Sequence, residues 1–290
     1  MTSTSPERHT DLPIGSLATR YRGVICDLDG VVYRGPEAVP GAIATLDVLA
    51  AAGVGIAFAT NNASRPPEDV TAHLVDLGLP PGEWSVVTSS EAAGAHLAAL
   101  LSPGARVLAV GGPGVSAALR ATGLTPVRLA DLDERPVQAV VQGLGVDVCW
   151  RELDEIAHQA RQGVPWVATN LDLSLPTARG SAPGNGALVR VVRAATTAEP
   201  HVTGKPGSDL FDLARTRLGT RAQDTLVIGD RLDTDIAGAN AAGLDSLLVL
   251  SGAATLEDLS SAQEHERPTY LADDLTALFA AGLRTPPPRG

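Results

Sequence analysis

Short apolar runs that lead into polar clusters recur along the chain. The run Val24–Cys26 leads into two acids and a glycine, and Val54–Ala59 leads into hydroxyl and amide side chains. Continuous apolar runs of this length are typical of strands that are buried on both faces of a sheet. Residues 42–52, which lie between the two runs, have the apolar spacing of a helix and end at a glycine. The alternation predicts an α/β fold with a Rossmann-like parallel sheet and crossover helices.

The alternation restarts near residue 89, which predicts a second domain. Residues 89–198 contain their own apolar strands and helical stretches, and a block of about 110 residues is long enough to bury a core. We therefore expect a catalytic core made of residues 21–88 and 199–290, with an inserted α/β cap domain at 89–198. Within the cap, the Gly- and Pro-rich stretch 176–186 is expected to be a loop.

The ends of the chain have a different composition. Residues 1–20 begin with a polar stretch rich in Pro, Ser and Thr that has no apolar segment, so we expect a disordered tail and not a signal peptide. The Pro-rich residues 285–290 are expected to be loose as well.

Charge and composition exclude several classes of function. The net charge of −11 and the isoelectric point near 4.9 disfavour nucleic acid or an anionic membrane as the main partner. No apolar stretch reaches the roughly 20 residues that a membrane span needs. Two cysteines in 290 residues favour a reduced, cytoplasmic setting over a disulfide scaffold. The sequence leaves a homodimer open.

Polar clusters at predicted strand ends carry the candidate chemistry. Four such clusters follow apolar strands: Asp27 with Asp29; Thr60 with Asn61 and Asn62; Lys205; and Asp230 with Asp235. Ligands of open parallel sheets bind at the carboxyl ends of the strands, where these clusters would meet. Carboxylates suit Mg²⁺, and a carboxylate can attack phosphorus while a second acid transfers protons. Hydroxyl groups and a lysine suit the phosphoryl oxygens. The pattern favours phosphoryl transfer.

Each cluster also has a simpler interpretation. The two strand-end acids alone would fit a solvated turn, and Thr60 and its neighbours would fit a helix N-cap. Lys205 would fit a surface charge, but it is the only lysine among 22 basic residues. Asp233 fits a solvated loop acid better than a ligand, and Asp235 would also fit a helix N-cap. The six histidines show no spacing typical of a zinc site.

The motifs in this order resemble the haloacid dehalogenase superfamily of phosphatases. They are Asp27-Leu-Asp-Gly-Val, Thr60-Asn-Asn-Ala-Ser, Gly204-Lys-Pro and Gly229-Asp-Arg-Leu-Asp-Thr-Asp. They most resemble the p-nitrophenylphosphatase/NagD-like branch, which carries a large α/β cap between the Thr and Lys motifs. Nearly the whole chain from about residue 21 shares the resemblance.

The resemblance implies a role for each motif residue. Asp27 would be the nucleophile and an Mg²⁺ ligand, and Asp29 the general acid/base, with its backbone carbonyl on the metal. Asp230 would be the third protein ligand of the metal, and Asp235 would hold metal-bound water or orient Lys205. The phosphoryl oxygens would be held by Thr60, Asn61, Asn62 and Lys205.

Substrate choice is expected from the cap, and the best candidate segment is 168–176. Its candidate specificity residues are Asn170, Asp172 and Ser174. The segment has neither an aromatic nor a basic residue, so a short polyol phosphate fits it best. The chain is also similar to actinobacterial glycerol-3-phosphate phosphatases, which makes glycerol 3-phosphate the expected substrate.

Other functions stay open. Pyridoxal phosphate, phosphoglycolate or a sugar phosphate are alternative substrates. A phospho-acceptor signalling module is the alternative from another class, because receiver domains also place Asp, Thr and Lys around Mg²⁺. Asp29 separates the two classes, since a receiver has no acid/base two residues after its phosphorylated aspartate.

Overall fold

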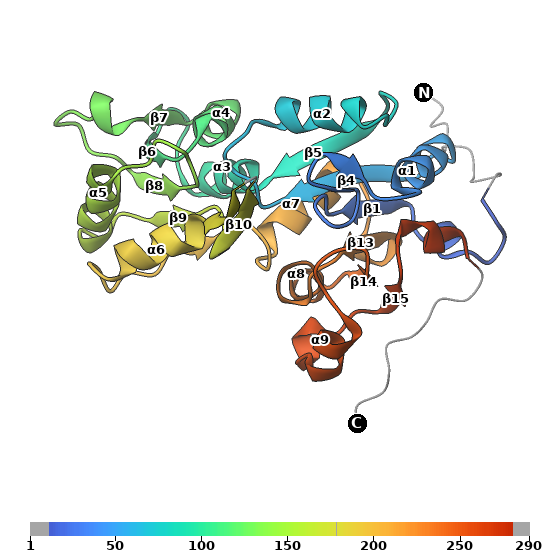
Figure 1. Cartoon of the computed structure of the whole chain (residues 1–290). Helices are drawn as coiled ribbons and strands as arrows, with labels where there is room; N and C mark the ends of the chain where they lie inside the picture. The colour runs from blue at the N-terminus through green and yellow to red at the C-terminus, as the bar shows by residue number, and fades with distance from the viewer. Residues whose placement is uncertain (1–11, 178, 281–290) are drawn as a thin grey trace, which may run out of the picture. The chain divides into compact units, whose positions relative to one another are not determined.

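The computed structural model describes residues 12–177 and 179–280 (Figure 1). These residues form two compact units, and each is described by itself. The first unit comprises residues 12–59, Thr71–Val86 and 211–280, and the second comprises Thr60–Val70 and Val87–Leu210.

The first unit is built on a six-stranded sheet. In spatial order its strands are β15 (Tyr270–Ala272), β14 (Asp245–Val249), β13 (Thr225–Gly229), β1 (Gly23–Cys26), β4 (Gly55–Thr60) and β5 (Trp84–Thr88). The neighbouring pairs from β15 to β4 are all parallel. All four residues of β1 are buried, as expected for a central strand without polar residues. Cys26 pairs with Ile228 on one side and Phe58 on the other, so three neighbouring strands end together.

The second unit is built on a five-stranded sheet of parallel strands. In spatial order they are β12 (His201–Val202), β9 (Trp166–Ala168), β8 (Ala139–Gln142), β6 (Arg106–Val110) and β7 (Thr125–Val127). Because side chains alternate along a strand, β6 directs Leu108 and Val110 to one face and Val107 and Ala109 to the other. The first face packs against α5 (Trp150–Arg161) and α6 (Asn185–Arg193), and the second against α3 (Ser89–Leu100) and α4 (Pro113–Ala121).

Strands of the first sheet are connected by α1 (Ala42–Ala51), α2 (Pro67–Asp76), α8 (Ala237–Ala241) and α9 (Leu256–Ser261). Helix α7 (Asp209–Leu218) follows β12 of the second sheet and precedes β13 of the first. Two parallel sheets with crossover helices confirm the predicted fold class. The division into a core of residues 21–88 and 199–290 and a cap of residues 89–198 remains a prediction. The structure does place β12 in the sheet of the second unit, although residues from 199 onward were expected to belong to the core.

Two local predictions are corrected by the structure. The expected loop at 176–186 contains a hairpin of β10 (Ser174–Thr177) and β11 (Gly180–Pro183). The Thr177 hydroxyl donates to the carbonyl of Gly180 across its turn, at 2.6 Å, so a polar side chain supports strands that lack an apolar pattern. In the expected N-terminal tail, Leu17–Arg20 form a 3₁₀ helix because Leu17 and Ala18 are buried. Residues 1–11 and 285–290 lie outside the described residues.

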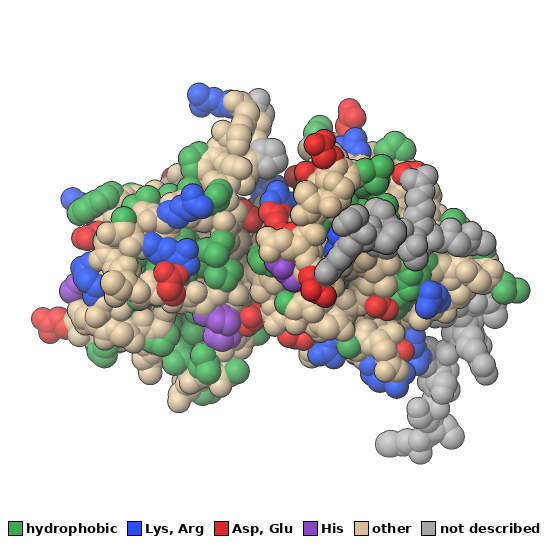
Figure 2. All heavy atoms as spheres, turned by 90° about the horizontal axis from the view of Figure 1, so that it is seen from below, with side chains coloured by type: hydrophobic (Ala, Val, Ile, Leu, Met, Phe, Trp, Pro, Cys, Tyr) green, Lys and Arg blue, Asp and Glu red, His purple; other side chains and the backbone are tan. Residues whose placement is uncertain are grey.

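The surface fits the acidic composition. Figure 2 shows Arg and acidic side chains interspersed among apolar and polar ones on the face that it draws. Within the part of the chain that the structure describes, no helix combines the length and apolarity needed to cross a membrane.

Candidate active site

Three acids of the first unit converge at the carboxyl ends of β1 and β13. Asp27 follows β1, and its N–H donates to the carbonyl of Ile228 in β13 at 2.8 Å. Asp230 follows the last residue of β13, and Asp235 lies one turn later. Each of the three acids offers a carboxylate oxygen, and these oxygens all lie within 4.8 Å of one another. Asp27 is half-buried and the other two are buried, and carboxylates this close are stabilised by a nearby cation or by protonation.

Asp230 is held in a tight space between two glycines. A Cβ on Gly30 would lie 2.3 Å from its Oδ2, and a Cβ on Gly252 would lie 2.0 Å from the same atom. The N–H of Ala253 donates to this oxygen at 2.6 Å. Gly30 also has a φ of +84°, which disfavours a side chain independently of the space. The glycine of the Asp-x-Asp-Gly motif therefore keeps space for an acid 200 residues later in the chain.

Asp235 is fixed by the helical turn that contains it. It lies in a π-helical turn, Leu232–Ile236, that leads into α8, and its carboxylate accepts from the N–H of Arg231 at 3.1 Å. A Cβ on Gly229 would lie 2.2 Å from the Cβ of Asp235, so the glycine lets the acid pack onto the end of β13. Asp233, in the same turn, is exposed and forms an ion pair with Arg231 at 2.8 Å.

Asp29 differs from these acids because it is exposed. Its neighbours Leu28 and Gly30 are buried, as the alternation of an extended chain requires. Asp29 forms an isolated β-bridge with Tyr33, and the N–H of Gly30 donates to the Tyr33 carbonyl at 2.7 Å. A small hairpin of β2 (Tyr33–Arg34) and β3 (Glu37–Ala38) follows this turn. The turn thus keeps the Asp29 side chain out of the core and open to solvent.

The three converging acids offer only oxygen ligands, which fits a hard dication such as Mg²⁺ or Ca²⁺. The space around Asp230 is also consistent with a metal ligand at this place. A larger residue at Gly30 or Gly252 would displace the Asp230 carboxylate from the other two acids. The donor set therefore fits the predicted magnesium ion.

A second polar cluster, in the second unit, is organised by Asn61. Its side-chain Oδ1 accepts from the N–H of Lys205 at 2.7 Å, and its Nδ2 donates to the Lys205 carbonyl at 3.1 Å. The same Nδ2 lies 3.2 Å from a carboxylate oxygen of Asp172. The Asn61 side chain thus holds the backbone on both sides of Lys205 and orients Asp172.

Gly204, the residue before Lys205, leaves the space that the Asn61 side chain needs to reach the Lys205 backbone. A Cβ on Gly204 would lie 2.6 Å from Oδ1 of Asn61 and 2.3 Å from the carbonyl of Thr169. Lys205 is only 4% exposed, so the simple interpretation as a surface charge is wrong. A buried ammonium needs anionic or polar partners, which is the property expected of a phosphate-binding lysine.

The candidate specificity residues have different environments. Asn170 is buried, and its Nδ2 donates to the carbonyl of Asn61 at 2.7 Å. The Asn170 carbonyl accepts from the buried Asn185 at 2.9 Å. Asp172 is half-buried next to Asn61, whereas Ser174 is exposed on β10. Asn170 and Asp172 therefore lie in the Asn61 cluster, whereas Ser174 belongs to the hairpin that follows it.

Thr60 and Asn62 form a turn instead of capping a helix. Thr60 is the last residue of β4, and its hydroxyl oxygen accepts from the N–H of Asn62 at 3.1 Å. Asn62 is exposed, and its Oδ1 accepts from the N–H of Ser64 at 3.0 Å. Helix α2 begins only at Pro67, so the N-cap interpretation of these residues is wrong.

Some residues that shape the two clusters were not predicted from the sequence. The Ser251 hydroxyl donates to the Gly30 carbonyl at 2.7 Å, and Gly252 packs against Asp230. The signal was the Ser-Gly pair directly after the apolar run of β14, which resembles the other strand ends. Asn185, by contrast, lies in the stretch 183–186, which is already expected from the sequence to lie behind the candidate specificity segment.

Comparisons with known proteins point to one family of hydrolases. A family model described as haloacid dehalogenase-like hydrolase matches residues 24–125, and a second, described as HAD-hydrolase-like, matches 202–278. The chain is 45% identical to a D-glycerol 3-phosphate phosphatase of Mycobacterium tuberculosis, over 91% of the chain and 72% of that protein. It is 34% identical to a 5′-nucleotidase of Bacillus subtilis, over 88% of the chain and 96% of that protein. A crystal structure of the glycerol phosphate phosphatase of M. tuberculosis in complex with magnesium has a TM-score of 0.85 and 44% identity, over 92% of the chain and 79% of that structure.

Proposed function

The chain belongs to the haloacid dehalogenase-like hydrolases, and from this premise we propose that it is an Mg²⁺-dependent phosphatase of a small phosphate monoester, with glycerol 3-phosphate as its preferred substrate. The convergence of Asp27, Asp230 and Asp235 at the ends of β1 and β13 is the observation that carries the reaction class. The 45% identity to a D-glycerol 3-phosphate phosphatase supports the choice of substrate.

In this proposal the metal is held by carboxylates of the first unit. Asp27 and Asp230 bind Mg²⁺ through side-chain oxygens, the Asp29 carbonyl is a third ligand, and Asp235 orients the surrounding groups. Bound Mg²⁺ supplies positive charge that stabilises the phosphoryl oxygens in the transition state.

Hydrolysis then proceeds in two balanced steps. A carboxylate oxygen of Asp27 attacks phosphorus, the bond from phosphorus to the ester oxygen breaks, and Asp29 protonates the leaving alcohol. Asp29, now a carboxylate, takes a proton from water as the water oxygen attacks the same phosphorus. The bond from phosphorus to Asp27 breaks, and inorganic phosphate leaves. Exposure of Asp29 supports this role, because the group must reach both the alcohol and the water.

The Asn61 cluster is proposed to bind the phosphoryl oxygens. Lys205 supplies a cation, and Thr60 with the backbone of Asn61 supplies hydrogen-bond donors. The Asn61 side chain is a positioning group in this proposal, since it already bonds to both backbone groups of Lys205. Asn62, which is exposed and folded onto Ser64, is the weakest of the predicted phosphate ligands.

A 5′-nucleotide is the second candidate substrate. The 34% identity to a 5′-nucleotidase, over nearly its whole length, favours it over pyridoxal phosphate and phosphoglycolate. Residues 170–174 contain no aromatic side chain for stacking on a base, which favours the smaller polyol phosphate. Asn170, Asp172 and Ser174 are the residues proposed to select the substrate.

A substrate panel tests the proposal. We would measure kcat/KM in Mg²⁺ for glycerol 3-phosphate, a 5′-nucleotide, pyridoxal phosphate, phosphoglycolate and a sugar phosphate. Glycerol 3-phosphate is expected to rank first. A higher value for another ester would replace the substrate and keep the reaction class. Stable phosphorylation by acetyl phosphate, without turnover of any ester, would instead support a phospho-acceptor module.

We also propose a cytoplasmic location, which the cysteine usage and composition support. The proposed mechanism uses residues of one chain and is compatible with a monomer or a homodimer.

A further inference from the structure

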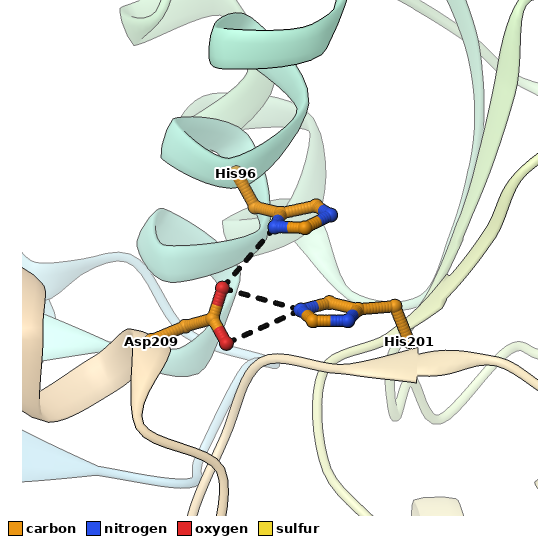
Figure 3. A group of neighbouring side chains, drawn as sticks. All are labelled: His96, His201 and Asp209. Atoms are coloured by element: carbon orange, nitrogen blue, oxygen red, sulfur yellow. Dashed lines mark hydrogen bonds and ion pairs between the residues drawn. The ribbon is translucent and has the colours of Figure 1, made fainter. Parts of the chain in front are cut away.

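Two histidines and one aspartate of the second unit converge from three separate elements (Figure 3). His96 lies on α3, His201 is the first residue of β12, and Asp209 is the first residue of α7. His96 Nδ1 lies 3.2 Å from Asp209 Oδ1, and His201 Nε2 lies 3.2 Å from both carboxylate oxygens. The two imidazole rings are stacked, with centroids 3.9 Å apart and an angle of 10° between their planes. Nδ1 of His96 and Nε2 of His201 therefore face the same carboxylate.

The chemistry of the three groups matches a transition-metal site. Imidazole and carboxylate are ligands of Zn²⁺, and three protein ligands with one open position are a common zinc arrangement. Zinc–ligand bonds of about 2.0–2.1 Å in a tetrahedral site place neighbouring ligand atoms about 3.3 Å apart. The observed separations of 3.2 Å from each histidine nitrogen to Asp209 agree with this spacing.

The ligand atoms are also accessible from solvent. His96 and Asp209 are half-buried, whereas the His201 side chain is 45% exposed, so an ion can enter from solvent.

We propose that His96 Nδ1, His201 Nε2 and an oxygen of Asp209 bind one divalent transition-metal ion, with Zn²⁺ as the best match. Its nitrogen donors separate it from the all-oxygen carboxylate cluster of the first unit, because imidazole favours zinc over magnesium. The ion would link α3 to the segment His201–Asp209, two parts of the second unit that are about 100 residues apart in the sequence. Metal binding would therefore stabilise this unit, independently of phosphatase activity.

Co²⁺ is a spectroscopic probe for this site, because it replaces Zn²⁺ and its visible absorption reports the coordination. The metal-free protein would be titrated with Co²⁺ in excess Mg²⁺, so that Mg²⁺ occupies the carboxylate cluster. One equivalent of Co²⁺ is expected to give the intense bands of a four- or five-coordinate site with nitrogen ligands. The bands should persist in an Asp230→Asn background, which removes a ligand of the carboxylate cluster.

His201→Ala tests the assignment, with His158→Ala as the matched control. His158 is an exposed histidine of α5 in the same unit, and its ring contacts the Gln162 side chain. His201→Ala should weaken Co²⁺ and Zn²⁺ binding at least about tenfold, whereas His158→Ala should bind as the unaltered chain does. Equal affinity in the two variants would overturn the proposal.

A measurement on the unaltered chain keeps the proposal testable if His201→Ala does not fold. Imidazole resonances of the six histidines would be recorded by NMR with and without one equivalent of Zn²⁺. Two of the six spin systems are expected to shift, in slow exchange, and the other four to stay in place. Absence of a shift, or a shift of a different set, would show that the three residues form only histidine–aspartate hydrogen bonds.

Discussion

The two units share a parallel-sheet architecture but place different chemistry around it. In the first unit, strands β1 and β13 lead into three carboxylates that lie close together. In the second, Asn61 links the backbone of Lys205 to Asp172 through amide hydrogen bonds. In the function that we propose, the acidic cluster makes and breaks bonds, and the Asn61 cluster binds the anion and selects the substrate. Substitutions in the two clusters should therefore differ in kind as well as in size.

The largest effect is expected from Asp27→Asn. An amide cannot act as the nucleophile, so turnover of p-nitrophenyl phosphate in Mg²⁺ should fall by at least about four orders of magnitude. Thermal unfolding should confirm that the variant folds like the unaltered chain. Activity within tenfold of normal would exclude a covalent role for this residue.

Lys205→Ala should have the next largest effect and tests the Asn61 cluster. Loss of a buried cation at the phosphoryl group should reduce kcat/KM by about 100- to 1,000-fold. Asn61→Ala should cost about tenfold, since each hydrogen bond of this kind contributes about 1–1.5 kcal/mol. If Asn61 acts through Lys205, the double variant should resemble Lys205→Ala alone. Additive losses would show that the Asn61 side chain acts separately.

Gly252→Ala should alter the metal requirement specifically. Its Cβ would overlap Asp230 Oδ2, so the carboxylate must move, and the Mg²⁺ concentration at half-maximal activity should rise by about 10- to 100-fold. Saturating Mg²⁺ should restore most of the activity, and EDTA should abolish it in both proteins. Gly82→Ala is the matched control, because the nearest atom to its Cβ, on Trp84, is 3.4 Å away. An unchanged Mg²⁺ dependence would contradict the predicted role of Asp230.

Asp172→Ala should have the smallest effect and should change selection instead of chemistry. Loss of its contact with Asn61 should raise KM for glycerol 3-phosphate about three- to tenfold, with little change in kcat. Asp154→Ala, an exposed acid of α5, controls for the loss of one negative charge. The ranking of substrates should change in the first variant and stay constant in the second. A fall in kcat alone would place Asp172 in the catalytic steps.

Local patterns were sufficient to predict the elements and the residues at the strand ends. Each apolar run that leads into Asp27, Thr60 or Asp230 forms a strand, because burial on both faces selects uninterrupted apolar residues. The 3.6-residue spacing of apolar residues predicted the helices between these strands, because each helix buries one face. The β10–β11 hairpin was missed because the residues of β11 are mostly exposed, so burial imposes no apolar pattern on them.

The meeting of the strand-end acids followed from the sheet, but other contacts between distant segments were beyond what the sequence could predict. The spacing of the histidines gave no indication that His96 and His201, 105 positions apart, would stack beside Asp209. The sequence also did not show that the Asn61 side chain bonds to the backbone of Lys205. The motifs around Asn61 and Lys205 would be the same if both side chains bound only phosphate. Such contacts depend on how sheet and loops bring segments together, and a single sequence does not encode that in its local spacing.

The role of Asp27 in a covalent intermediate is tested most directly by trapping that intermediate. Asp29→Asn should still allow Asp27 to attack phosphorus on an ester with a good leaving group, such as p-nitrophenyl phosphate, but it should slow attack by water by about 10²–10⁴-fold. The variant would be quenched in acid during turnover, and the phosphorylated residue located by mass spectrometry. We expect a phosphoryl group on Asp27, which should be missing when Asp27→Asn is added. Phosphate on another residue, or steady turnover without any phosphorylated protein, would show that the mechanism is wrong.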